Sequence, residues 1–260
     1  MHFQDLKQVN KFFLIAGPCV VESEELCFEV ASKLKEFTAE CNIPLIFKAS
    51  YKKANRTSVN SFSGLNEDKA LQVLADVKSK FNIPVLTDIH ESTDAAKVAA
   101  IADVIQIPAF LCRQTELLLA AGKTGKIVNI KKGQFVSADV MRFAAEKVQS
   151  SGNHSIILTE RGTMFGYNDQ VVDFRNIPLM KNFGFPVVLD VTHSVQKPNA
   201  ASGASGGAPE FIETLAKCGL AAGANGLFIE THPDPSMALS DGSTMLRLDE
   251  LKHLLQKLAQ

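Results

Sequence analysis

Eight short runs of apolar, β-favouring residues recur along the chain and alternate with longer segments whose apolar residues have helical spacing. The runs cover residues 12–16, 43–48, 84–89, 104–107, 127–131, 156–159, 187–191 and 226–230. Three of the helical segments follow a residue that can cap a helix, and they are 24–40 after Ser23, 67–80 after Asn66 and 139–149 after Ser137. The alternation predicts parallel βαβ units, because a parallel crossover needs a long and usually helical return.

The runs are almost continuously apolar, so we expect strands that are buried on both faces. Eight such strands in 260 residues favour a closed (β/α)₈ barrel, the TIM barrel, over an open doubly wound sheet. The turn after the first run, Ala16-Gly17-Pro18-Cys19, also lacks the G-x-G-x-x-G pattern of such sheets. Because the composition shows no linker, we interpret residues 1–260 as a single domain, with 197–209 as a mobile loop on the barrel face.

Charge and targeting signals exclude several classes of protein. The 28 acidic and 27 basic residues leave a formal net charge of −1, so we expect no nucleic-acid partner and no attraction to a membrane surface. The N-terminus lacks a secretory signal pattern, and no apolar run approaches the ~20 residues of a membrane-spanning helix. The five scattered cysteines contain no C-x-x-C pair. We therefore expect a cytoplasmic protein in a reducing compartment.

Polar or ionisable residues follow nearly all of the eight runs. They are Cys19; Lys48, Ser50, Lys53, Asn55 and Arg56; Asp88 and His90; Gln106 and Arg113; Lys131, Lys132 and Gln134; Glu160 and Arg161; Asp190 and His193; Glu230 and His232. Active sites of (β/α)₈ barrels are built where the strands end. Residues without a function would be spread over both ends of the barrel, so this concentration predicts a functional site.

Several of these residues are cations that converge from different strands. They are Lys48, Lys53, Arg56, Lys131 and Arg161, with Arg113 as a further candidate. Their mutual repulsion would be costly unless an anion lay among them. A cationic cleft in a nearly neutral chain indicates a small substrate with several negative charges.

A second group combines sulfur, nitrogen and oxygen donors. It consists of Cys19, His193, Glu230 and Asp241, with His232 as an alternative ligand. The last strands of a closed barrel are neighbours of the first, so these residues can meet. Such a set suits a borderline divalent metal ion such as Zn²⁺, Fe²⁺ or Mn²⁺ better than Ca²⁺ or Mg²⁺.

Eleven collinear motifs resemble those of the 3-deoxy-D-manno-octulosonate 8-phosphate synthase family, over about residues 12 to 250. They include Ala16-Gly-Pro-Cys19, Phe47-Lys-Ala-Ser50, Lys53-Ala-Asn-Arg56, Asn129-Ile-Lys-Lys-Gly-Gln-Phe135, Asp190-Val-Thr-His193 and Ile229-Glu-Thr-His-Pro-Asp-Pro235. The resemblance implies condensation of phosphoenolpyruvate with D-arabinose 5-phosphate, which releases inorganic phosphate and serves lipopolysaccharide biosynthesis. It also implies a homotetramer.

Two alternatives stay open beside this family. The related 3-deoxy-D-arabino-heptulosonate 7-phosphate synthases use erythrose 4-phosphate and typically have Lys-Pro-Arg-Thr where this chain has Lys53-Ala-Asn-Arg56. A non-catalytic barrel that binds sugar phosphates would be expected to have lost a ligand or a cation, and none is missing. Metal-dependent members of the octulosonate family have Cys where others have Asn, so Cys19 implies a metal-dependent enzyme.

The resemblance also implies a role for each matching residue. Lys48, Lys131 and Arg161 would bind phosphoenolpyruvate, with Lys53 and Gln106 nearby. Asn55, Arg56 and Thr57 would hold arabinose 5-phosphate, whose phosphate Arg113 from a neighbouring subunit would also reach. The remaining expected substrate-binding residues are Ser50, Pro108, Ala109, Phe110 and Gln134, and the candidates for proton transfer are Asp88, His90 and Asp241.

Overall fold

Eight parallel strands close into a barrel in the computed structural model, which describes residues 2–55, 61–164, 169–197 and 206–260. In chain order they are β1 (Phe13–Gly17), β2 (Leu45–Lys48), β3 (Val85–Asp88), β4 (Val104–Ile107), β5 (Ile127–Lys131), β6 (Ile156–Glu160), β7 (Val187–Asp190) and β10 (Gly226–His232). Each strand pairs with the next, and β10 pairs with β1. The predicted (β/α)₈ barrel is confirmed, and each predicted strand end lies within two residues of the observed one.

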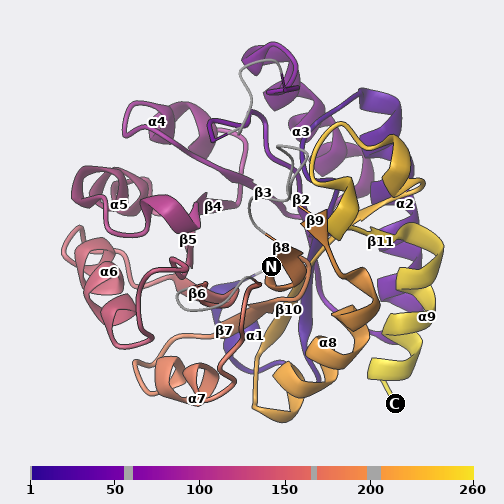
Figure 1. Cartoon of the computed structure of the whole chain (residues 1–260). Coiled ribbons are helices and arrows are strands. Elements are labelled where there is room, and N and C mark those ends of the chain that lie inside the picture. The colour runs from indigo at the N-terminus through magenta and orange to yellow at the C-terminus, as the bar shows by residue number, and fades with distance from the viewer. Residues whose placement is uncertain (1, 56–60, 165–168, 198–205) are drawn as a thin grey trace.

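Helices form a ring around the barrel (Figure 1). They are α2 (Glu24–Cys41), α3 (Glu67–Phe81), α4 (Asp94–Ala99), α5 (Thr115–Lys123), α6 (Val140–Gln149), α7 (Asn176–Lys181), α8 (Ile212–Ala221) and α9 (Leu248–Leu258). Ser23 and Asn66 accept backbone hydrogen bonds at the starts of α2 and α3, as predicted. Ser137 does not cap α6, because the helix begins only at Val140, after a residue with helical backbone angles. Within the described ranges, no helix has the length and apolar character needed to cross a bilayer.

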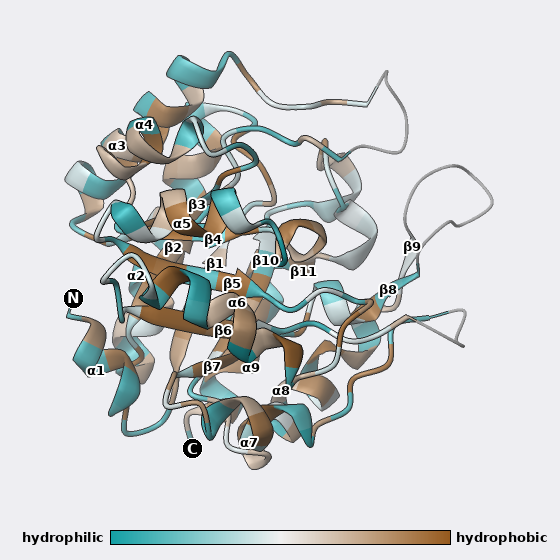
Figure 2. Cartoon of the chain, turned by 90° about the vertical axis from the view of Figure 1, so that its left-hand side faces the viewer, coloured by the Kyte–Doolittle hydropathy of each residue, from teal (hydrophilic) through white to brown (hydrophobic). Residues whose placement is uncertain are grey.

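Short 3₁₀ turns and two-residue strands lie beyond the carboxyl ends of the barrel strands. They are the 3₁₀ turns η1 (Ala109–Leu111), η2 (His193–Val195), η3 (Pro209–Phe211), η4 (Pro235–Met237) and η5 (Gly242–Thr244), and the strands β8 (Gln196–Lys197), β9 (Gly206–Gly207) and β11 (Leu246–Arg247). The antiparallel pair β8 and β9 lies beyond the barrel on the right of Figure 2. This pair forms the base of the segment predicted as a mobile loop, of which 198–205 lie outside the described residues.

The amino-terminal half of the barrel interior is apolar. Its buried layer consists of Phe13, Ile15, Ile46, Leu86, Val104, Ile157, Val188 and Phe228. Helix α1 (Phe3–Lys7) adds the fully buried Leu6 to this layer and so closes that end of the barrel. Figure 2 shows α1 at the end opposite β8 and β9. Outward-facing strand residues such as Leu14 and Val128 pack against the helices in a larger cluster.

The carboxyl-terminal half of the interior is polar. Successive side chains on a strand point to opposite faces, so a residue two positions further along faces the same way. The buried inward pairs are Ile46 and Lys48, Leu86 and Asp88, Val104 and Gln106, Val188 and Asp190, and Phe228 and Glu230. The strands therefore supply stability in their first half and polar chemistry in their second.

We expect Leu6→Ala to lower the free energy of unfolding by about 2–5 kcal/mol, because it leaves a cavity under the apolar layer. Urea denaturation measures this loss. Lys7→Ala removes an exposed side chain from the same helix and is the matched control. Equal losses in the two variants would mean that Leu6 packing does not hold α1 in place.

Candidate active site

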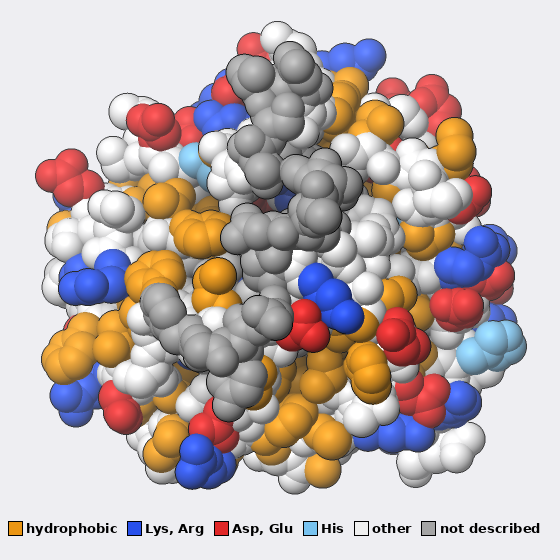
Figure 3. Space-filling view, in the orientation of Figure 1, with side chains coloured by type: hydrophobic (Ala, Val, Ile, Leu, Met, Phe, Trp, Pro, Cys, Tyr) orange, Lys and Arg blue, Asp and Glu red, His pale blue; other side chains and the backbone are white. Residues whose placement is uncertain are grey.

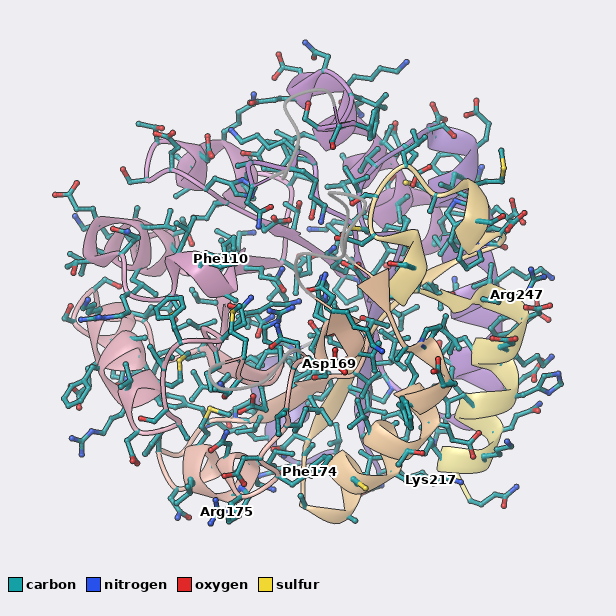
Figure 4. All side chains as sticks on the ribbon, viewed as in Figure 1. Phe110, Asp169, Phe174, Arg175, Lys217 and Arg247 are labelled. Atoms are coloured by element: carbon teal, nitrogen blue, oxygen red, sulfur yellow. The ribbon has the colours of Figure 1, made fainter. Side chains whose placement is uncertain are left out.

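A cavity of about 1260 Å³ opens at the carboxyl ends of the strands. It exceeds the ~300–1,000 Å³ typical of a site for one small ligand, so it has room for two. The site residues predicted from the sequence that line it are Lys48, Ser50, Lys53, Asn55, Asp88, His90, Gln106, Pro108, Ala109, Phe110, Lys131, Gln134, Arg161, His193, Glu230 and Asp241. Figure 4 shows nitrogen-bearing side chains gathered over the centre of the ring, with Phe110 on η1 at its left.

The other predicted site residues have different positions. Arg56 and Thr57 lie outside the described residues. Cys19 is fully buried, and its thiol donates a hydrogen bond to Asp241 Oδ2 at 3.2 Å. Arg113 lines a separate hollow of about 500 Å³ together with Phe143. Among the described residues that were predicted to bind substrate, Arg113 alone does not line the large cavity.

Two buried ion pairs lie inside the polar half of the barrel. Lys48 Nζ is 2.6 Å from Glu230 Oε1, and Lys131 Nζ is 2.5 Å from Asp190 Oδ2. Burial favours a raised pKa for Glu230, but the charges of Lys48 and other nearby cations hold that pKa well below its usual value. Phe228 lies beneath, with its ring centroid 3.6 Å from Lys131 Nζ, a distance suited to a cation–π contact. The carboxylates of Glu230 and Asp190 thus neutralise Lys48 and Lys131. From the sequence alone, a bound anion was expected to offset the repulsion among these cations.

Two cavity-lining cations differ from these pairs. Lys53 and Arg161 have no carboxylate within ion-pairing distance among the described residues. Arg161 Nη2 instead donates to the His193 carbonyl at 3.2 Å and to Gln196 Oε1 at 2.6 Å. On the outer face seen in Figure 3, acidic and basic side chains both lie around the periphery. Inside the cavity, Lys53 and Arg161 therefore remain available to an anionic ligand.

Seven buried polar atoms of cavity-lining side chains have no hydrogen-bond partner in the described part of the chain. They are Ser50 Oγ, Asp88 Oδ1, His90 Nδ1, Gln134 Oε1, Gln170 Oε1, Gln170 Nε2 and Glu230 Oε2. Buried polar atoms in folded proteins are nearly always hydrogen-bonded. Their concentration around one cavity indicates that a bound ligand completes the hydrogen bonding.

Asp88 and His90 contact each other on the cavity wall. His90 Nε2 lies 3.1 Å from Asp88 Oδ2. Burial acts to raise the pKa of Asp88, but the hydrogen bond from His90 and the charges of Lys53 and Lys48 together hold it well below its usual value. Asp88 is therefore ionised at neutral pH and has no proton to donate.

Three predicted metal ligands meet at one side of the cavity. Donor atoms of Cys19, Glu230 and Asp241 lie within 4.8 Å of one another. His193 adjoins this group, because its Nε2 is 3.7 Å from Glu230 Oε2 while its Nδ1 is 2.7 Å from Asp190 Oδ2. Burial, and next the charge of Glu230, raise the pKa of the Cys19 thiol.

The alternative ligand His232 has another neighbour. Its Nε2 lies 3.9 Å from Glu22 Oε2, and its Nδ1 accepts a hydrogen bond from the Asp234 N–H. His232 is not a member of the group of mutually close donor atoms found among the described residues.

Three side chains with a place in this site received no role from the sequence. Asp190 binds Lys131 and His193, Gln196 binds Arg161, and the Ser240 hydroxyl is 2.9 Å from Cys19 Sγ. Asp190 stands at a strand end, and Ser240 directly precedes Asp241. These positions in the sequence could have marked Asp190 and Ser240 as candidate site residues. Neither position shows which side chain the residue contacts.

Comparisons with known proteins identify the family. The sequence model of the DAHP synthetase I family matches residues 8–260. The chain belongs to the DAHP synthetase I family. The motif resemblance described above is thereby confirmed, since the curated relatives within this family carry the name of an octulosonate phosphate enzyme.

Three relatives of this DAHP synthetase I family member are each named 2-dehydro-3-deoxyphosphooctonate aldolase. The protein of Trichlorobacter lovleyi is 54% identical over 245 residues, which cover 94% of this chain and 90% of that protein. The protein of Brucella anthropi is 52% identical over 247 residues, 95% of this chain and 89% of that protein. The protein of Granulibacter bethesdensis is 51% identical over 249 residues, 96% of this chain and 88% of that protein.

We expect Asp190→Asn in this family member to lower the free energy of unfolding by about 3–5 kcal/mol, because it leaves the buried Lys131 charge unpaired. Chemical denaturation measures the change. Asp173→Asn is the control, because Asp173 forms an exposed ion pair with Arg175, which Figure 4 labels at the periphery of the molecule. It should leave the unfolding midpoint unchanged. A wild-type midpoint for Asp190→Asn would contradict the importance of the buried pair.

Proposed function

We propose that the protein condenses phosphoenolpyruvate with D-arabinose 5-phosphate and water to give 3-deoxy-D-manno-octulosonate 8-phosphate and inorganic phosphate, a step of lipopolysaccharide biosynthesis. The names of the relatives support this product, because 2-dehydro-3-deoxyphosphooctonate denotes the same sugar acid phosphate. The observation that carries the proposal is a cavity for two ligands that contains Lys53 and Arg161 without carboxylate partners among the described residues.

The cavity offers separate contacts to the two substrates. Arg161, Lys131 and Lys48 would bind phosphoenolpyruvate, with Lys53 and Gln106 beside it. Asn55, with Arg56 and Thr57, would bind arabinose 5-phosphate. Charge-assisted hydrogen bonds contribute about 1.5–3 kcal/mol each. Holding both substrates in a fixed relation lowers the entropic barrier of a reaction between two molecules.

Carbon–carbon bond formation would come from the enol ether. C3 of phosphoenolpyruvate attacks the aldehyde carbon of the open-chain sugar, and positive charge develops at C2. Water adds at C2, and the tetrahedral intermediate then loses phosphate by cleavage of its C–O bond. Water loses one proton when it adds at C2, and the C2 hydroxyl loses the second when phosphate leaves. One of these two protons reaches the new hydroxyl oxygen of the sugar, and the other ends on inorganic phosphate. Asp88, His90 and Asp241 are the candidates for these proton transfers.

We propose that Cys19, His193, Glu230 and Asp241 hold a divalent ion such as Zn²⁺, Fe²⁺ or Mn²⁺. The buried Glu230 Oε2 has no hydrogen-bond partner among the described residues. If His193 Nδ1 donates to Asp190, its Nε2 lone pair faces that same oxygen, and a cation would satisfy both atoms. When bound, such an ion supplies Lewis-acid stabilisation of developing negative charge.

A homotetramer is part of the same proposal. Arg113 lines a hollow beside Phe135 and Phe143, away from the residues of the large cavity. Phe143 is 52% exposed and Phe135 is 37% exposed, and a group of exposed apolar side chains on one hollow is a candidate contact for another subunit. For Arg113 to contact a sugar phosphate, it would therefore need to approach the cavity of a neighbouring subunit.

Phosphate release from phosphoenolpyruvate tests the activity. We expect rapid release with arabinose 5-phosphate, slow release with erythrose 4-phosphate, and inhibition by a chelator. Faster release with erythrose 4-phosphate would identify a heptulosonate 7-phosphate synthase instead. Binding of both substrates without release of phosphate would identify a non-catalytic barrel.

We expect Cys19→Asn to reduce the metal content of the purified protein, because it replaces a soft sulfur donor by a neutral amide. Elemental analysis of protein loaded with Zn²⁺ measures this directly, without reference to activity. Cys218→Ser changes an exposed cysteine on α8 and serves as the control. Unchanged metal content in the Cys19 variant would exclude Cys19 as a ligand.

A further inference from the structure

We propose that the buried ion pair of Lys132 and Glu160 positions the two cations Lys131 and Arg161 in the active site. This inference rests on the proposed function, which gives Lys131 and Arg161 their contact with phosphoenolpyruvate. Lys132 and Glu160 are themselves fully buried and do not belong to the residues that line the cavity. They are therefore positioning residues rather than catalytic residues.

Lys132 connects two neighbouring βα loops through its ammonium group. Its Nζ lies within hydrogen-bonding distance of the carbonyl oxygens of Gly133, Val136 and Gly162 and of Thr163 Oγ1, at 3.2–3.3 Å. It also lies 3.4 Å from Glu160 Oε1. Some of these acceptors belong to the loop after β5 and the others to the end of β6 and the loop after it. A single side chain thus ties both loops together.

Glu160 fixes the second loop from the other side. Its Oε1 accepts hydrogen bonds from the backbone N–H groups of Arg161 at 3.0 Å and Gly162 at 2.7 Å. Its Oε2 accepts a hydrogen bond from Asn176 Nδ2 at 2.9 Å. Gly162 has a φ of +90°, a left-handed conformation that favours glycine at this turn. The backbone that carries Arg161 is therefore held directly by the preceding carboxylate.

Each member of the pair is adjacent in sequence to one of the two cations: Lys132 follows Lys131, and Glu160 precedes Arg161. Lys131 faces the barrel interior, where it reaches Asp190, and its neighbour Lys132 points to the opposite face of the strand. The guanidinium of Arg161 is also held at its far end by Gln196. A shift of either loop would therefore displace a cation that has little freedom to compensate.

The polar nature of the pair argues for positioning rather than for stability. A buried ion pair gains little stability over apolar residues of similar volume, because both charges lose their hydration. Apolar side chains, however, have no groups that can bind the carbonyls of Gly133, Val136 and Gly162. Lys132 and Glu160 supply directional contacts between the loops that an apolar replacement cannot supply.

The test uses the full-length chain with Lys132→Met, with Glu160→Gln and with both changes together. Each single variant leaves a charge or a polar group without its partner, so a lower melting temperature is expected. The double variant removes both charges and should regain part of this stability, while the three carbonyls that Lys132 contacts stay without that donor. Its KM for phosphoenolpyruvate should still be raised at least about tenfold, because the contacts between the loops remain absent. Its KM for arabinose 5-phosphate should be unchanged.

Asn153→Ala is the matched structural control. Asn153 is a buried residue before β6, at the opposite end of the barrel, and its Nδ2 donates to the carbonyls of Gly122 and Lys126. This variant should lower the melting temperature and leave both KM values unchanged.

A wild-type KM for phosphoenolpyruvate in the double variant would overturn the positioning role. Equal increases in both KM values, or KM values that follow melting temperature across all variants including Asn153→Ala, would overturn it as well. If the wild-type chain shows no turnover, the proposed function itself fails. Calorimetric titration with phosphoenolpyruvate then decides the positioning role, which requires weaker binding by the double variant than by the wild-type chain.

Discussion

Charge pairing inside the closed barrel is the interaction on which the active-site half of this structure depends. Lys48 and Glu230 come from β2 and β10, and Lys131 and Asp190 come from β5 and β7. A buried charge without a partner destabilises a fold by several kcal/mol. Lys48 and Lys131 therefore each require a carboxylate from another strand. The closed barrel brings these strands together, so a change in one member of a pair affects the other. Among the described residues of the cavity, Lys53 and Arg161 are not held in such a pair, so they can contact an anionic ligand without breaking one.

The apolar half of the barrel makes this arrangement tolerable. Phe228 separates the two halves, since its ring lies under Lys131 and its neighbours belong to the buried layer that Leu6 completes. Below this ring the interior gains stability from burial of apolar surface, and above it the interior loses stability through desolvation of charges. The strands are long enough to carry both layers, because only two inward positions per strand are needed. Glu230, for example, follows Phe228 at the next inward position.

The sequence predicted the barrel and half of the residues that line the cavity, because both depend on local patterns at the strand ends. Strand period and strand number define the fold, and the fold gathers the strand ends that carry residues such as Lys48 and Asp88. It predicted the meeting of Cys19 with Glu230 because β1 and β10 are neighbours in any closed barrel of this kind. It did not predict that Asp190 pairs with Lys131, since such a pair depends on side-chain geometry across the barrel interior. The predicted cap of α6 was wrong, because Ser137, a good capping residue by type, precedes a turn rather than the helix.

Asp190 contacts a member of each of the two groups that the sequence analysis treated separately, the cations and the candidate metal ligands. Its Oδ2 lies within hydrogen-bonding distance of both Lys131 Nζ and His193 Nδ1, and its Oδ1 accepts hydrogen bonds from the His193 N–H and the Thr192 hydroxyl. The carboxylate thus fixes a cation of the proposed phosphoenolpyruvate site and the ring of a proposed metal ligand at once. Any movement of Lys131 toward a substrate would change the electrostatic environment of His193, and any charge placed near His193 would change that of Lys131. The proposed anion site and the proposed metal site therefore share one buried carboxylate, a contact that neither motif predicts by itself.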